Sequence, residues 1–173
     1  MSAAATKRAL LLLPQEGFDD ETYRHVRAYL GNRGVEARVA SGALSLAKGE
    51  RVDETAPDLA LDAVDPASFD AAIVIGGEGG ASLADDPRAH RILRGVAEKG
   101  GVVGAAGSGV LVLARAGLLK GKKVTGDASQ IGQLVESGAR WKGGEVVTDG
   151  RCVTAGPGAG LRFAAKIGLL LGR

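Results

Sequence analysis

The sequence is poor in aromatic residues, in histidine and in cysteine, and each scarcity excludes a class of function. One Trp, two Tyr and three Phe, scattered over 173 residues, cannot form the stacking platform of a nucleic-acid-binding surface. The single cysteine, Cys152, excludes an internal disulfide and fits a reducing cytoplasm. One cysteine and two dispersed histidines show no metal-ligand spacing, so we expect neither a metal nor another cofactor.

Charge excess and long apolar runs are also missing. The formal net charge is +2, from 22 Lys and Arg against 20 Asp and Glu, which is too small to indicate a polyanionic partner. The apolar run near the N-terminus is much shorter than the roughly 20 residues of a membrane span, and it is typical of a buried strand. We therefore expect a cytoplasmic protein that binds neither nucleic acid nor membrane.

Apolar runs alternate with helical patterns along the chain, which predicts a mostly parallel sheet with helices on both faces. Continuous apolar runs predict buried strands at 8–14, 35–40, 71–75 and 102–106. Helices are expected over 18–33, 87–99, 109–116, 128–137 and 161–171, with a short strand at 123–125. Two hairpins are predicted, one turning at Lys48-Gly49 and one at Asp149-Gly150. The whole chain, 1–173, is expected to form one α/β domain in three layers.

Glycine is abundant, at 28 residues, and clusters where the predicted strands end. In parallel sheets, ligands bind beyond the carboxyl ends of the strands. Backbone N–H groups in the turns at 76–80 and 107–109 could hold an anion or an oxyanion there. The candidate ligand-binding residues are Gly76, Gly77, Gly107, Ser108 and Gly109. The alternative is that IGGEGG is a strand-to-helix turn without a ligand.

Four segments, in order, resemble the ThiJ/PfpI superfamily. They are the opening strand with its acidic turn and helix, DLALDAVDPASFDAAIVIGGEGG, GLLKGKKVT after LVLARA, and VVTDGRCVTAGPGAG. The resemblance implies a flavodoxin-like fold of the class I glutamine amidotransferase kind. It also implies a homodimer or higher homo-oligomer, and a family of cysteine-dependent peptidases, deglycases and glyoxalases that includes many stress proteins.

The same resemblance places the family's nucleophilic cysteine on Gly107 and the histidine after it on Ser108. The family's chemistry requires a thiolate on a strained turn at a helix N-terminus, tuned by a nearby carboxyl group. Glycine provides no nucleophile, and it also relaxes the strain of such a turn. Gly107 therefore argues against the family's usual activity.

No other residue replaces the cysteine and the histidine in the pattern. Ser108 lacks the G-x-S-x-G context of a serine hydrolase and is interpreted as a helix N-cap. His25 and His90 lie within predicted helices, and neither follows a strand. Cys152 lies in an apolar strand, where a small buried core residue is expected.

The acidic partner of the missing cysteine is ambiguous. The family's first acidic position coincides with Asp19, and its usual glutamate with Thr22, or with Glu21 if the alignment shifts by one residue. A simpler interpretation of Asp19, Asp20 and Glu21 is a helix N-terminus with favourable negative charge. No histidine occurs between positions 125 and 141, where some relatives supply one.

Three hypotheses remain open. In the first, the protein is a non-catalytic member that binds a small molecule, an anion or a partner at the degenerate crevice, in stress physiology. In the second, it is a hydrolase, protease, glyoxalase or deglycase-like enzyme that uses Ser108 or a bound water. In the third, glycine was introduced at position 107 of an active cysteine enzyme, although the neighbouring Ser108 argues against a single targeted change.

Overall fold

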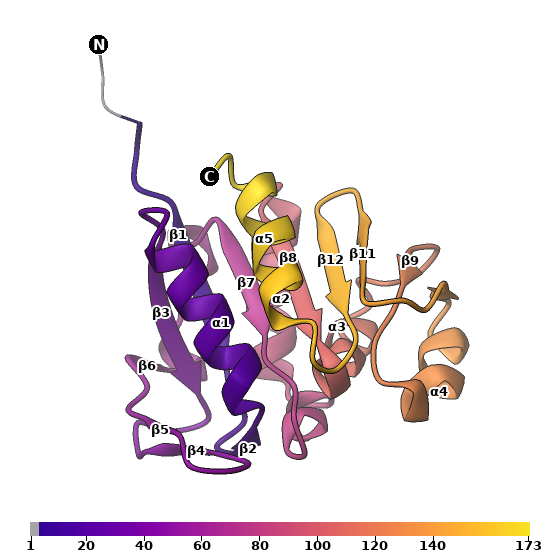
Figure 1. Ribbon diagram of the computed structural model, residues 1–173, viewed down its shortest axis with the longest axis horizontal. Coiled ribbons are helices and arrows are strands. Elements are labelled where there is room, and N and C mark those ends of the chain that lie inside the picture. The colour runs from indigo at the N-terminus through magenta and orange to yellow at the C-terminus, as the bar shows by residue number, and fades with distance from the viewer. Residues whose placement is uncertain (1–3) are drawn as a thin grey trace.

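The computed structural model describes residues 4–173 around a seven-stranded central sheet (Figure 1). The strand order is β11-β12-β8-β7-β1-β3-β6, and every neighbouring pair is parallel except β11 and β12. The bounds are β1 (Arg8–Leu12), β3 (Glu36–Ser41), β6 (Leu59–Ala60), β7 (Ala71–Val74), β8 (Val102–Ala106), β11 (Val146–Asp149) and β12 (Cys152–Ala155).

Helices cover both faces of this sheet, because the central strands are apolar on both sides. Helices α1 (Asp20–Gly31) and α5 (Gly160–Leu170) pack together on one face, and α2 (Pro87–Glu98) and α3 (Val110–Arg115) cover the other (Figure 1). Alternate β1 residues enter the two cores: Leu10 lies in the α2 and α3 core and Leu11 in the α1 and α5 core. The flavodoxin-like α/β fold predicted from the sequence is confirmed.

Shorter elements surround the main sheet. Strands β2 (Glu16–Phe18), β4 (Ala47–Gly49) and β5 (Glu54–Thr55) form a three-stranded sheet, and β9 (Lys123–Val124) pairs with β10 (Arg140–Trp141) beside α4 (Ile131–Glu136). Within residues 4–173 there are also five 3-10 segments: η1 (Leu61–Ala63), η2 (Pro66–Ser68), η3 (Gly80–Leu83), η4 (Gly107–Gly109) and η5 (Ala128–Gln130). Within residues 4–173, no helix has the length and apolar character needed to cross a bilayer.

One predicted hairpin is confirmed and the other is misplaced. Asp149 and Gly150 do lie at the turn between antiparallel β11 and β12, and Gly150 has a φ of +60°. Lys48 and Gly49, however, lie within β4, and the turn to β5 follows at 50–53. The prediction was wrong because Gly49 is required for a close approach: a Cβ atom there would overlap the carboxylate of Asp20.

Candidate functional site

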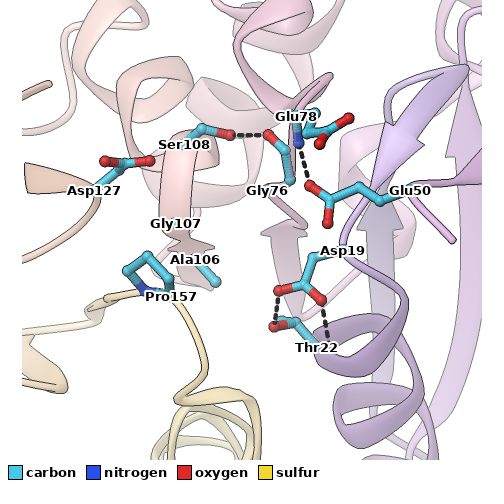
Figure 2. Close-up of a pocket in the computed structure, with 11 residues that line it drawn as sticks. Asp19, Thr22, Glu50, Gly76, Glu78, Ala106, Gly107, Ser108, Asp127 and Pro157 are labelled. Atoms are coloured by element: carbon cyan, nitrogen blue, oxygen red, sulfur yellow. Dashed lines mark hydrogen bonds between the residues drawn. The ribbon is translucent and has the colours of Figure 1, made fainter. Parts of the chain in front are cut away.

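A cavity of about 250 Å³ opens beyond the carboxyl ends of the central strands (Figure 2). Turns that follow β2, β7, β8, β9 and β12 bring residues distant in the sequence to this cavity. Its lining includes the predicted Asp19, Gly76, Gly77, Gly107 and Ser108. The cavity lies where a ligand site is expected in a parallel α/β sheet.

Gly107 forms the turn from β8 into η4 with a φ of +58°, in the left-handed region that favours glycine. A Cβ atom at this position would meet no other heavy atom within 4 Å. Packing therefore does not require glycine here, and a side chain would extend into open space. The elbow has the geometry that presents a nucleophile, but it carries none.

Ser108 makes a hydrogen bond across the site. Its hydroxyl donates to the carbonyl oxygen of Gly77 at 2.5 Å, whereas neither η4 nor α3 has a side-chain cap. The interpretation of Ser108 as a helix N-cap was therefore wrong, because the hydroxyl joins two neighbouring turns. In this arrangement its proton is held by a carbonyl group and is not shared with a base.

Gly76 and Gly77 allow three turns to pack closely. A Cβ atom on Gly76 would lie 2.9 Å from the amide nitrogen of Ser108 and would overlap the carbonyl oxygen of Ala106. The Gly76 carbonyl accepts the N–H of Asp19 at 2.8 Å, and Gly77 has a φ of +117°. These contacts are a structural reason for both glycines. Gly109 is buried against Val74 and lies outside the cavity lining.

The acidic residues at the start of α1 have separate roles. Asp19 is the N-cap: its carboxylate accepts the N–H of Glu21 at 3.1 Å and the hydroxyl of Thr22 at 2.8 Å. Thr22 lines the cavity, whereas Glu21 is exposed and lines a neighbouring hollow. Of these two candidates for the position of the family glutamate, Thr22 is the one that lines the cavity, and its hydroxyl is already bonded to Asp19 (Figure 2).

Five lining residues were not among the predicted site residues: Glu50, Glu78, Ala106, Asp127 and Pro157. Glu50 comes from the turn between β4 and β5, and its carboxylate accepts the backbone N–H of Glu78. Glu78 belongs to the IGGEGG turn, and Asp127 and Pro157 follow β9 and β12, so their place after strand ends was a usable signal. Glu50 had no such signal, because a separate small sheet brings it to the cavity.

The lining contains four carboxylates, on Asp19, Glu50, Glu78 and Asp127, and no Lys or Arg. This charge opposes an anion, since like charges in a partly enclosed cavity repel. Of the ligands expected from the sequence, a small molecule or an anion, the acidic lining therefore disfavours the anion. Within residues 4–173, no three His, Cys, Asp or Glu side chains converge as a metal site.

The histidines and the cysteine lie away from the cavity lining. His90 contacts the carbonyl oxygen of Ala84 through Nε2 at 2.5 Å, and His25 packs beside Gly160 of α5. Cys152 is buried, and this burial raises the pKa of its thiol to about 12. None of the three is placed to assist chemistry at Gly107.

Comparison with known proteins agrees with this fold. The DJ-1/PfpI family model matches residues 7–168. A glutathione-independent glyoxalase of Caenorhabditis elegans, DJR-1.2, is 32% identical over 95% of this chain and 88% of its own length. Deglycase TK1284 of Thermococcus kodakarensis is also 32% identical, over 84% of this chain and 88% of its own.

Solved structures give the same result. A ThiJ/PfpI domain protein from Brachyspira murdochii superposes with a TM-score of 0.94 at 28% identity, covering 98% of each chain. Drosophila melanogaster DJ-1beta superposes with a TM-score of 0.86 at 28% identity, covering 98% of this chain and 92% of its own. The family model, the related sequences and the solved structures agree, and the chain belongs to the DJ-1/PfpI family.

Proposed function

We propose that this chain is a single-domain, non-catalytic member of the DJ-1/PfpI family that binds a small neutral or cationic molecule in the cavity at Gly107. The observation that carries the proposal is the elbow itself: a left-handed turn, open to the cavity, with no side chain. Nucleophilic catalysis requires a nucleophile with a base within hydrogen-bond reach. The cavity lining supplies no thiol and no imidazole.

A non-catalytic chain lacks the glyoxalase and deglycase activities for which its relatives are named. Methylglyoxal clearance by the purified protein should equal that of heat-denatured protein, with the Caenorhabditis elegans glyoxalase assayed in parallel as a positive control. Clearance within about ten-fold of that control would refute the non-catalytic assignment, because ten-fold corresponds to only about 1.4 kcal/mol of barrier.

The charge of the ligand follows from the four carboxylates of the lining. Agmatine, which carries an ammonium and a guanidinium group, should shift the amide NMR resonances of Gly107 and Ser108 saturably, whereas succinate should not. Glu78→Gln should weaken the agmatine response, and Glu21→Gln, at an exposed position outside the lining, should leave it unchanged. Equal responses to agmatine and succinate would contradict the assignment.

A second candidate function is a glyoxalase, deglycase or hydrolase activity that uses Ser108 or a bound water, with the N–H groups of Gly76 and Gly77 as oxyanion donors. Support comes from relatives that are named a glyoxalase and a deglycase. It predicts a measurable turnover that Ser108→Ala abolishes while the circular dichroism spectrum is retained. A turnover that survives this substitution would eliminate the role of Ser108 and leave the bound water.

We further propose that the protein is a cytoplasmic homodimer. The support is exposed apolar surface on the segment that carries Glu50, at Leu44, Leu46 and Val52. Such surface favours contact with another protein, here a second copy of the chain. Light scattering should give about twice the 17.5 kDa chain mass, and Val52→Asp should reduce it. A monomeric mass at high protein concentration would reject the dimer.

A further inference from the structure

Two adjoining hollows lie at the amino ends of β8 and β12, at the opposite end of the strands from Gly107. They measure about 330 and 190 Å³ and share Gly100, Gly101 and Arg151. We call them together the amino-end cleft. None of their lining residues contributes to the cavity at Gly107, so the cleft is a separate feature of the molecule.

The larger hollow has an apolar floor and apolar walls. Val103 and Cys152 are paired neighbours on β8 and β12, and both side chains belong to the core on the α2 and α3 side of the sheet. Half-buried Ala97 and Leu118 stand beside them. A hollow of this size and lining accommodates a short hydrocarbon chain.

Cations surround the apolar floor. Lys122 and Arg151 line the larger hollow, and Lys7, Lys99 and Arg151 line the smaller one. Across the part of the chain that the structure describes, none of the four forms an ion pair with a carboxylate. Lys99 and Arg151 donate only to the carbonyl oxygens of Ala67 and Leu170.

Among the lining residues of the cleft there is one carboxylate, in the smaller hollow, and a second, that of Asp149, lies outside the lining but near Cys152 on the paired strand β11. The lining carboxylate belongs to Asp70, and its Oδ2 atom accepts the backbone N–H of Arg8 at 2.9 Å. The cleft therefore combines an apolar interior with an excess of positive charge at its mouth. This is the reverse of the cavity at Gly107, whose lining is acidic.

We propose that the amino-end cleft binds a small carboxylate with an apolar body, the hydrocarbon against Val103 and Cys152 and the carboxylate against Lys122 and Arg151. Charge complementarity selects the headgroup, because a carboxylate gains hydrogen bonds from cations that lack an acidic partner. The hydrophobic effect favours binding of the hydrocarbon, because it covers apolar surface at Ala97 and Leu118.

The test titrates the full-length protein with octanoate and follows backbone amides by NMR. Octanoate should shift Gly101, Val103 and Cys152 saturably with one molecule bound per chain. Octylammonium and acetate, at equal concentrations, should not. Equal binding of acetate would indicate an adventitious ion only, and equal binding of octylammonium would remove the selection by charge. Either result overturns the proposal, as would octanoate shifts centred on Gly107.

Variants separate the roles of charge and shape. Lys122→Gln should weaken octanoate binding about five-fold, the effect of one partly screened charge. Lys123→Gln, at the next residue but outside the lining, should change it less than about two-fold. Ala97→Phe should abolish binding by filling the larger hollow. If Ala97→Phe does not fold, equal affinities of the two lysine variants would still overturn the proposal.

Discussion

The carboxylate of Asp20 holds the backbone of Asp53: its Oδ1 atom accepts the Asp53 N–H at 2.7 Å. The same carboxylate accepts the N–H groups of Arg51 and Val52 at 3.0 and 3.1 Å. Asp20 is 2% exposed, so these three bonds lie largely out of water. The first turn of α1 thereby fixes the turn that presents Glu50 to the cavity.

Asp20→Ala should therefore destabilise the protein strongly. Three backbone N–H groups would lose their acceptor, and we expect the free energy of unfolding in urea to fall by about 2–4 kcal/mol. Glu21→Ala, at an exposed position in the same helical turn, should change it by less than about 0.5 kcal/mol. Equal losses in the two variants would show that Asp20 does not anchor the turn.

The same contacts make part of the stability depend on pH. Burial raises the pKa of Asp20, but the hydrogen bonds from the N–H groups of Asp53, Arg51 and Val52 together lower it by more. The pKa of Asp20 is therefore below its ordinary value of 3.8. A carboxyl group whose pKa is lower in the folded than in the unfolded protein stabilises the fold at pH values above the unfolded pKa. This stabilisation is lost as the pH falls through the folded pKa. The difference in unfolding free energy between wild type and Asp20→Asn should stay constant from about pH 7 to about pH 5 and shrink below about pH 4. A difference that grows on acidification would contradict this sign.

Gly107→Cys should be tolerated and should give a reactive thiol. The new Cβ atom would enter open space, and the φ of +58° should cost about 1–2 kcal/mol. Gly117→Cys is a matched control for the cost of the left-handed backbone, since Gly117 also has no neighbour within 4 Å and has a φ of +79°. We expect iodoacetamide to label the introduced thiol while leaving buried Cys152 unmodified, as mass spectrometry of the peptides would show.

Gly107→Cys should nevertheless restore no methylglyoxal clearance, because no histidine lines the cavity and the Thr22 hydroxyl is bonded to Asp19. Clearance by this single variant would mean that the remaining lining is sufficient for chemistry. In that case the lost side chain would be the sole defect of the site.

Gly76→Ala should be far more damaging than a helical glycine replacement. Its Cβ atom would overlap the carbonyl oxygen of Ala106, and relieving this overlap must move the elbow. We expect a loss of at least about 3 kcal/mol in thermal or urea unfolding. Gly132→Ala, in α4 with no neighbour within 4 Å, should instead stabilise by about 0.5–1 kcal/mol. A neutral Gly76→Ala would show that the turns are loosely packed.

Strands β1, β3, β7 and β8 of the main sheet could be predicted because they appear as continuous apolar runs, whereas the short, half-buried β6 was not predicted. Strand β8 was predicted at the bounds that the structure has, Val102–Ala106, and Gly107 was expected directly after it. The resemblance to the ThiJ/PfpI superfamily implied the elbow at Gly107, and glycine readily adopts the left-handed φ that the structure shows there.

The remainder of the site depends on contacts between distant segments. Whether Thr22 or Glu21 faces the cavity depends on the rotation of α1, which the N-cap at Asp19 sets. Glu50 reaches the cavity because Asp20 holds its turn, and the sequence shows no periodic pattern around Glu50. Gly49 indicated a turn in the sequence, although its actual cause is the proximity of Asp20.

The anchoring of residues 50–53 by Asp20 also gives the two sides of the cavity different local stabilities. Gly107 follows a central strand of the core, whereas the turn at 50–53 is held by polar bonds, three of them to the carboxylate of Asp20 and one from the Glu50 N–H to the carbonyl oxygen of Phe18. Amide protons at 50–53 should thus exchange with solvent by local opening, well before those of β8. A molecule bound between the two sides would slow that exchange, so deuterium uptake at this turn would report occupancy without any catalytic assay.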